Sequence, residues 1–168
     1  MTGFLRVLGI GLACALLWTA AASRVVDHTR LPPSAVVVGA AVAQPFGCTT
    51  LELEPFDPFC PARHVHTGID LAAPAGTAVH AATAGFARVG YDERGAGLFV
   101  AIAFDDHVRI LYCHLRRAIV ASGRQVSAGE VIGEVGATGL ATGPHVHLEI
   151  QVDGRSVDPA IWLASAPS

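Results

Sequence analysis

Glycine and proline interrupt this chain so often that few segments are long enough for an ordinary helix. The 168 residues include 18 Gly and 10 Pro. Turn signals fall at residues 92–97, 105–106, 121–123, 136–143 and 153–154. Between such signals, strands are expected at Ala78–Val89, Leu98–Phe104, His107–Leu115, Val131–Val135 and His145–Val152. The pattern predicts an all-β fold, an antiparallel sandwich or barrel of short strands, with one helical turn after Pro159.

The N-terminal residues have the order of an export signal. Arg6 precedes an apolar run from Val7 to Ala22. The run is shorter than the roughly 20 residues that span a membrane, and it ends in small residues, so a cleaved signal peptide over residues 1–23 is favoured. A signal anchor that attaches the protein to the membrane through residues 7–22 remains an open alternative, as does a buried helix. A lipoprotein modified at Cys14 is disfavoured, because the apolar run continues past that residue.

The remaining length has room for one domain. We expect a tether at residues 24–43, with room for an edge strand at Val36–Val38, then a domain over residues 44–163 and a tail at 164–168. The net charge is -3. Nucleic acid is therefore an unfavourable partner, because no basic field would attract it.

Cysteine usage suggests one disulfide. With Cys14 in the signal, the exported part keeps Cys48, Cys60 and Cys113. Cys48 and Cys60 bracket a short loop rich in proline and acidic residues, and in an oxidising compartment we predict that these two pair. Closing a loop of that size contributes about 3 kcal/mol in the chain-entropy model. A Cys/Cys/His metal site is the rival interpretation.

Two segments concentrate histidine and acidic residues. RHVHTGID at residues 63–70 holds His66 and Asp70 at HxxxD spacing, and GPHVHLE follows at 143–149. Strand alternation puts His145, His147 and Glu149 on one face, opposite Val146, Leu148 and Ile150. The apolar face belongs to the core, so the histidines face a cleft or solvent. Two imidazoles and a carboxylate form a common zinc set, in which a catalytic site keeps a position for water.

The same segments resemble the lysostaphin-like (LytM-type) zinc endopeptidases of peptidoglycan. The resemblance starts at Gln44–Gly47, covers HTGIDLAAPAGTAVHAATAG, YCHL at Tyr112–Leu115 and VSAGEVIGEVGATGLATGPHVHLEI, and ends in VDPAIWL at Val157–Leu163. It therefore spans nearly the whole expected domain. It implies a β fold of the duplicated hybrid motif kind, a zinc cofactor, peptidoglycan peptides as substrate and an extracytoplasmic location.

By this resemblance, the zinc ligands are His66, Asp70 and His147, and the catalytic histidines that are not ligands are His114 and His145. His145 is expected to take a proton from the attacking water and pass it to the leaving amine, since imidazole titrates near working pH. His114 is expected to hydrogen-bond the water or the developing oxyanion. Hydrogen-bond acceptors that contact the ligand side chains should orient these ligands. The sequence does not identify the acceptors.

The other candidate residues have ordinary explanations. His64 is as compatible with a surface role as with a cleft role, and Glu149 is expected to be a surface carboxylate at a strand end. Ordinary packing or solvent exposure accounts for His28, His80 and His107.

Three functions other than a peptidase are compatible with parts of the sequence. A non-catalytic module that binds peptidoglycan or activates another hydrolase is disfavoured by the complete ligand set. A biotinyl- or lipoyl-carrier-like domain is excluded, because the chain has no lysine to modify. A structural zinc protein should supply a fourth protein ligand.

Overall fold

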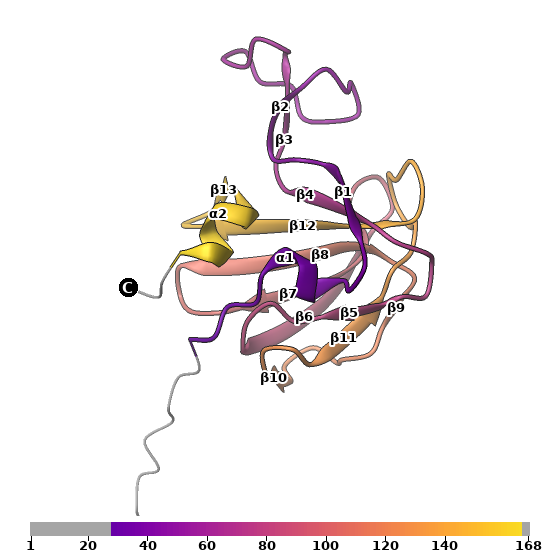
Figure 1. Cartoon of the computed structure of the whole chain (residues 1–168), viewed down its shortest axis with the longest axis vertical. Helices are drawn as coiled ribbons and strands as arrows, with labels where there is room; N and C mark the ends of the chain where they lie inside the picture. The colour runs from indigo at the N-terminus through magenta and orange to yellow at the C-terminus, as the bar shows by residue number, and fades with distance from the viewer. Residues whose placement is uncertain (1–27, 166–168) are drawn as a thin grey trace, which may run out of the picture.

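The computed structural model describes residues 28–165, and its strands form three antiparallel sheets (Figure 1). The eight-stranded sheet follows the order β1 (Ala41–Gln44), β4 (Ile69–Ala72), β12 (His145–Val152), β8 (Val108–Leu115), β7 (Gly97–Ala103), β6 (Gly85–Asp92) and β10 (Gln125–Val126), with β13 (Arg155–Val157) also paired to β12. The three-stranded sheet consists of β5 (Ala78–His80), β11 (Val131–Glu134) and β9 (Arg117–Ala118). The smallest sheet pairs β2 (Gly47–Thr49) with β3 (His64–His66). The expected all-β antiparallel fold is confirmed.

The hydrophobic core joins the two larger sheets. Alternate residues of β12 (Val146, Leu148 and Ile150) are fully buried and pack in one cluster with Val79 of β5 and Ile132 of β11. Tyr112 of β8 is also fully buried, and its hydroxyl oxygen accepts a hydrogen bond of 2.7 Å from the Ala82 amide. The other face of β12 is thereby left to His145, His147 and Glu149, as strand alternation predicts.

Two short helices lie beside the sheets. α1 (Pro33–Val36) contacts β5 and α2, and α2 (Pro159–Ala164) contacts β12. Asp158 begins α2 by accepting hydrogen bonds from the Ala160 and Ile161 amides, so the helical turn expected after Pro159 is present.

The segment expected to be a tether differs from that expectation. Val36 and Val37 are fully buried in the core, and the edge strand expected at Val36–Val38 is instead the helix α1 followed by a turn. Pro33 stands in the first turn of that helix, where a missing amide hydrogen costs nothing. Burial of Val36 and Val37 therefore packs α1 against the domain, whereas residues 41–43 of β1 are exposed and join it by pairing with β4.

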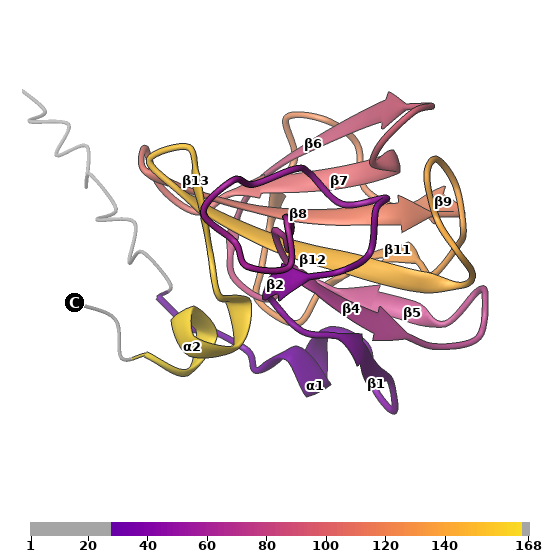
Figure 2. The same cartoon turned by 90° about the horizontal axis from the view of Figure 1, so that it is seen from above.

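A long loop between β2 and β3 projects from the large sheet beside β1 and β4 (Figures 1 and 2). A disulfide joins Cys48 to Cys60 and closes this loop, which confirms the expected pairing. Cys113 is a free, buried thiol, and burial raises its pKa to about 12.

No helix within residues 28–165 has the length and apolar character to cross a membrane. The expected signal or anchor at residues 1–23 lies outside the described residues.

Candidate metal and catalytic site

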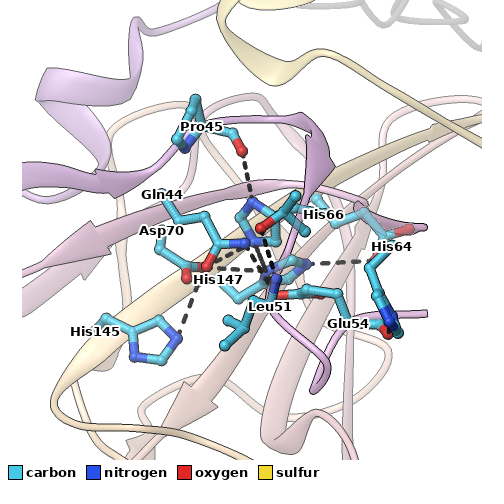
Figure 3. A network of polar contacts seen from close by, with 11 residues as sticks. Gln44, Pro45, Leu51, Glu54, His64, His66, Asp70, His145 and His147 are labelled. Atoms are coloured by element: carbon cyan, nitrogen blue, oxygen red, sulfur yellow. Dashed lines mark hydrogen bonds and ion pairs between the residues drawn. The ribbon is translucent and has the colours of Figure 1, made fainter. Parts of the chain in front are cut away.

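Three side chains from three strands bring one acceptor atom each to a common point (Figure 3). His66 ends β3, Asp70 lies in β4, and His147 lies in β12 directly opposite Asp70 in the antiparallel register. The His66 Nε2 and His147 Nδ1 atoms lie 2.9 Å apart, and each is 3.1 Å from Asp70 Oδ1. The structure thus brings together the three residues that the resemblance singled out as ligands.

The hydrogen bond at the far side of the His66 ring determines which nitrogen faces the cluster. The Nδ1 atom of His66 donates to the Pro45 carbonyl at 2.8 Å, which leaves the Nε2 lone pair for the shared point. His66 is fully buried, so this orientation is held by packing as well. Histidines that bind metals typically donate their other ring N–H to a carbonyl in this way.

The geometry of the three atoms suits a small cation. Ligand atoms in a tetrahedral zinc site lie about 3.3 Å apart, given zinc–ligand bonds near 2.0–2.1 Å. The separations of 2.9–3.1 Å here are close to that edge. Two imidazole nitrogens and one carboxylate oxygen therefore fit a zinc ion with its fourth position open.

Gly68 gives the His147 ring its space. A Cβ atom at this position would lie 2.8 Å from His147 Nε2 and would collide with the Leu148 carbonyl. The backbone at Gly68 is not in the left-handed region, so the requirement is steric. The glycine in HTGID is therefore part of the site although it carries no donor atom.

Charges within the cluster couple Asp70 to the histidines. Burial alone would raise the pKa of Asp70, but the neighbouring His147 and His66 side chains hold it well below its usual range. Burial alone would lower the pKa of His147, but the hydrogen bond to Asp70 and the nearby Glu149 carboxylate raise it to about 9. Asp70 is therefore held in its carboxylate form, which is the form that binds a cation.

His145 and His114 flank the cluster. Their ring centroids lie 4.7 Å apart, and His145 Nε2 is 3.7 Å from Asp70 Oδ1. Each donates its Nδ1 hydrogen to a backbone carbonyl at 2.8 Å, His145 to Gly143 and His114 to Thr138. In both rings Nε2 is then left as a proton acceptor.

His114 sits at an irregular point of β8. Leu98 pairs with Leu115 and Val100 with Tyr112, so β8 carries one extra residue there, a β-bulge. The φ angle of His114 is 62°, which costs a residue with a side chain of order 1–3 kcal/mol and is most often retained at functional sites. Burial lowers the pKa of His114, as do the neighbouring His145 and His147, so this ring is neutral at neutral pH.

A cleft of about 450 Å³ opens over these residues. One wall is the loop between β2 and β3, through Leu51, Leu53, Glu54 and Pro55, and other walls include Arg94 and Leu140. The sequence did not predict Glu54 as a site residue. Its Oε1 atom lies 3.9 Å from His66 Nε2 and accepts a hydrogen bond from Gln44 (Figure 3).

The remaining histidines lie apart from the cluster. The Nδ1 atom of His64 donates to the Glu54 carbonyl at 2.8 Å and so anchors the cleft loop. The Nδ1 atom of His80 lies 3.3 Å from the Val36 carbonyl oxygen. His107 forms an ion pair with Asp153, and the His28 ring contacts the Phe104 ring. Glu149 differs from its expected surface role: its side chain is only 13% exposed and it lines the cleft.

Similar curated proteins are much longer than this chain. The sequence is 43% identical over 103 residues to the DD-carboxypeptidase/endopeptidase Mpg of Neisseria meningitidis serogroup B, a match that covers 61% of this chain and 24% of that protein. It is 39% identical over 93 residues to the peptidoglycan DD-endopeptidase ShyA of Vibrio cholerae, covering 55% of this chain and 22% of that protein. The chain thus matches about a quarter of the length of these relatives.

Solved structures share the fold. A zinc-containing peptidase from Vibrio cholerae has a TM-score of 0.66 at 26% identity, over 84% of this chain and 41% of that one. The catalytic domain of lysostaphin from Staphylococcus simulans has a TM-score of 0.62 at 28% identity, over 75% of this chain and 93% of that one. The model of peptidase family M23 matches residues 64–159, which include His66, Asp70, His114, His145 and His147. More than half of the chain is matched, and the protein therefore belongs to peptidase family M23.

Proposed function

We propose that this protein is an exported zinc-dependent endopeptidase that hydrolyses peptide bonds in peptidoglycan. The observation that carries the proposal is the convergence of His66 Nε2, Asp70 Oδ1 and His147 Nδ1 beside two further histidines in an open cleft. Membership of family M23 supports peptidase chemistry, and the names of the relatives Mpg and ShyA support peptidoglycan as the substrate.

In this proposal His66, Asp70 and His147 hold the zinc ion. When bound, zinc polarises a peptide carbonyl and lowers the pKa of water toward about 7. Pro45 orients the His66 ring through its carbonyl, and Gly68 leaves room for the His147 ring. These contacts fix the ligand atoms before any cation arrives, which reduces the reorganisation that binding requires.

His145 is the proposed general base and acid. Its Nε2 atom faces the cluster with the lone pair free, because Nδ1 donates to Gly143. It would take a proton from the attacking water and return it to the leaving amine. Neutral His114 accepts a hydrogen bond through Nε2 in the same way, so its first role is to orient that water, and it can donate to an oxyanion only after protonation.

An extracytoplasmic location follows from the substrate. Peptidoglycan lies outside the cytoplasm, and the disulfide between Cys48 and Cys60 is the type of bond that persists in oxidising compartments. The export signal proposed at residues 1–23, or an anchor at residues 7–22, would deliver the domain there.

The test compares five single alanine variants with the unaltered protein. Changing a ligand (His66, Asp70 or His147) should remove zinc and hydrolysis together, because binding depends on the set of three. His145→Ala and His114→Ala should keep one zinc per chain and lose roughly a hundredfold or more in turnover. Zinc is measured by elemental analysis and hydrolysis by release of peptidoglycan fragments. If the unaltered protein binds zinc yet cleaves no peptidoglycan, a non-catalytic binding or activating module replaces the proposal.

A further inference from the structure

We infer that Glu149 is a positioning residue that fixes the His147 ring for metal binding. The inference rests on the proposed function, because it assumes that His147 is a zinc ligand through Nδ1. It concerns a side chain for which the sequence predicted only a surface role.

Other side chains occupy one of the two oxygens of the Glu149 carboxylate. The Ser156 hydroxyl donates to Glu149 Oε1 at 2.6 Å, and the Gln151 amide donates to the same atom at 2.9 Å. Ser156 comes from β13, which pairs with the end of β12. The hairpin of β12 and β13 therefore holds the carboxylate in one orientation.

The second oxygen faces the ligand ring. Glu149 Oε2 lies 3.8 Å from His147 Nε2, an ion-pair distance somewhat longer than a hydrogen bond. Strand alternation places the two side chains on one face of β12, two residues apart, and both are only 13% exposed.

Gly68 lies beside the same Nε2 atom, where even a methyl group would collide with the ring. His147 Nε2 is therefore close to both Gly68 and the Glu149 carboxylate. An anion at Nε2 favours the hydrogen on that atom and leaves the lone pair on Nδ1, which is the atom that faces His66 and Asp70.

The two ligand histidines thus have different partners. His66 donates to a neutral carbonyl of Pro45, whereas His147 faces a carboxylate. A carboxylate behind a ligating imidazole raises its basicity, and loss of such a partner typically lowers metal affinity by 10–100-fold. Glu149 should accordingly strengthen zinc binding without being a ligand itself.

The experiment measures zinc affinity by chelator competition in Glu149→Ala and Glu149→Gln, with Glu134→Ala as the control. Glu134 is a carboxylate of similar exposure, 18%, that pairs with Arg116 and Arg117 instead of a ligand. We expect about a 10–100-fold weaker affinity for Glu149→Ala and a smaller loss for Glu149→Gln, whose carbonyl oxygen keeps a partial negative charge beside the ring. Glu134→Ala should keep the affinity of the unaltered protein.

A second readout separates positioning from general destabilisation. The visible absorption bands of the Co²⁺-substituted protein report the geometry of the ligands, and they should shift in Glu149→Ala but not in Glu134→Ala. Unchanged affinity and bands in both Glu149 variants, or losses no larger than in Glu134→Ala, would overturn the inference. If the unaltered protein binds no zinc, or if His66→Ala binds it equally well, the proposed function itself fails, and the inference with it.

Discussion

Among single residues, Gly68 is important for the cluster of His66, Asp70 and His147 although it has no side-chain atom that could bind a metal. Gly68→Ala should displace the His147 ring, because the added Cβ would lie 2.8 Å from its Nε2 atom and would also meet the Leu148 backbone. We expect zinc content and hydrolysis to fall together, with loss of stability of roughly 1–3 kcal/mol from overpacking. Elemental analysis and chemical denaturation measure the two effects.

Gly143→Ala is the matched control, since it lies in the neighbouring GPHVH segment and a Cβ there meets nothing within 4 Å. Its zinc content should equal that of the unaltered protein. Equal zinc content in Gly68→Ala would show that the ring has other room, and the steric account would be wrong.

Sequence reasoning identified the residues with donor atoms better than those that orient them. The HxxxD and HxH spacings pointed to the two segments, and the resemblance to lysostaphin-like endopeptidases singled out His66, Asp70 and His147 within them as ligands. The carbonyls of Pro45, Gly143 and Thr138 had no signal, since any residue type supplies a carbonyl. Glu149 was expected at the surface because the sequence does not show that Ser156 folds back onto it.

At the scale of elements, the disulfide should matter most for the loop between β2 and β3. Cys48 and Cys60 are separated by 12 positions, and Leu51, Leu53 and Glu54 between them line the cleft. Replacing both cysteines with serine should lower the free energy of unfolding by about 2–4 kcal/mol and raise the KM more than it lowers kcat, because the ligand strands remain paired. Denaturant unfolding and steady-state hydrolysis measure these changes.

Cys113→Ser is the comparison for the disulfide variant, since Cys113 is a free thiol. It should leave the sensitivity of the loop to reducing agents unchanged. Identical stability of the double serine variant and the unaltered protein would contradict the role given to the disulfide.

Two turns are joined by a titratable pair. The Nδ1 atom of His107 lies 2.7 Å from Asp153 Oδ1, and the hydrogen bond and charge of Asp153 raise the pKa of His107. A raised folded-state pKa means that the stabilisation is fully present below the unfolded-state value and is lost as pH rises through the folded-state value. His107→Ala should therefore destabilise the protein more near pH 5.5 than at about pH 9.

Chemical denaturation at the two pH values tests this prediction, and Asp153→Asn should remove the same pH-dependent increment. An equal effect of His107→Ala at both pH values would show that the pair contributes nothing through its charge.

The longer strands could be predicted from the sequence, whereas most of the shorter ones, with the exception of β11 (Val131–Glu134), could not. His145–Val152 coincides with β12, and His107–Leu115 contains β8, since alternation over eight residues is a strong signal. Ala78–Val89 instead divides into β5 and β6, which belong to different sheets. Strands of two to four residues, such as β9 and β4, are defined by their pairing partners more than by their own sequence. Val36–Val38 was misassigned for the same reason, because tertiary burial decided its structure.

In the whole molecule, the two faces of the large sheet have different roles, one in packing the core and one in forming the site. One face of β12 packs in the core with β5 and β11, and the opposite face carries the histidines and the cleft. The proposed ligands come from the consecutive strands β3 and β4 and from β12, whose His147 lies 81 positions after His66, so the cluster exists only when the sheets are assembled. Metal binding should therefore stabilise the folded domain as a whole.

In the proposed function, cleavage of peptidoglycan peptides requires a zinc ion held by His66, Asp70 and His147. The most direct measurement is mass spectrometry of cross-linked muropeptides digested by the native protein, by the protein after removal of metal with a chelator, and by the same protein after one equivalent of zinc is restored. We expect cleavage at a peptide bond, its loss on removal of metal and its return with zinc. Undiminished cleavage by the metal-free protein, or none by the zinc-loaded protein, would contradict it.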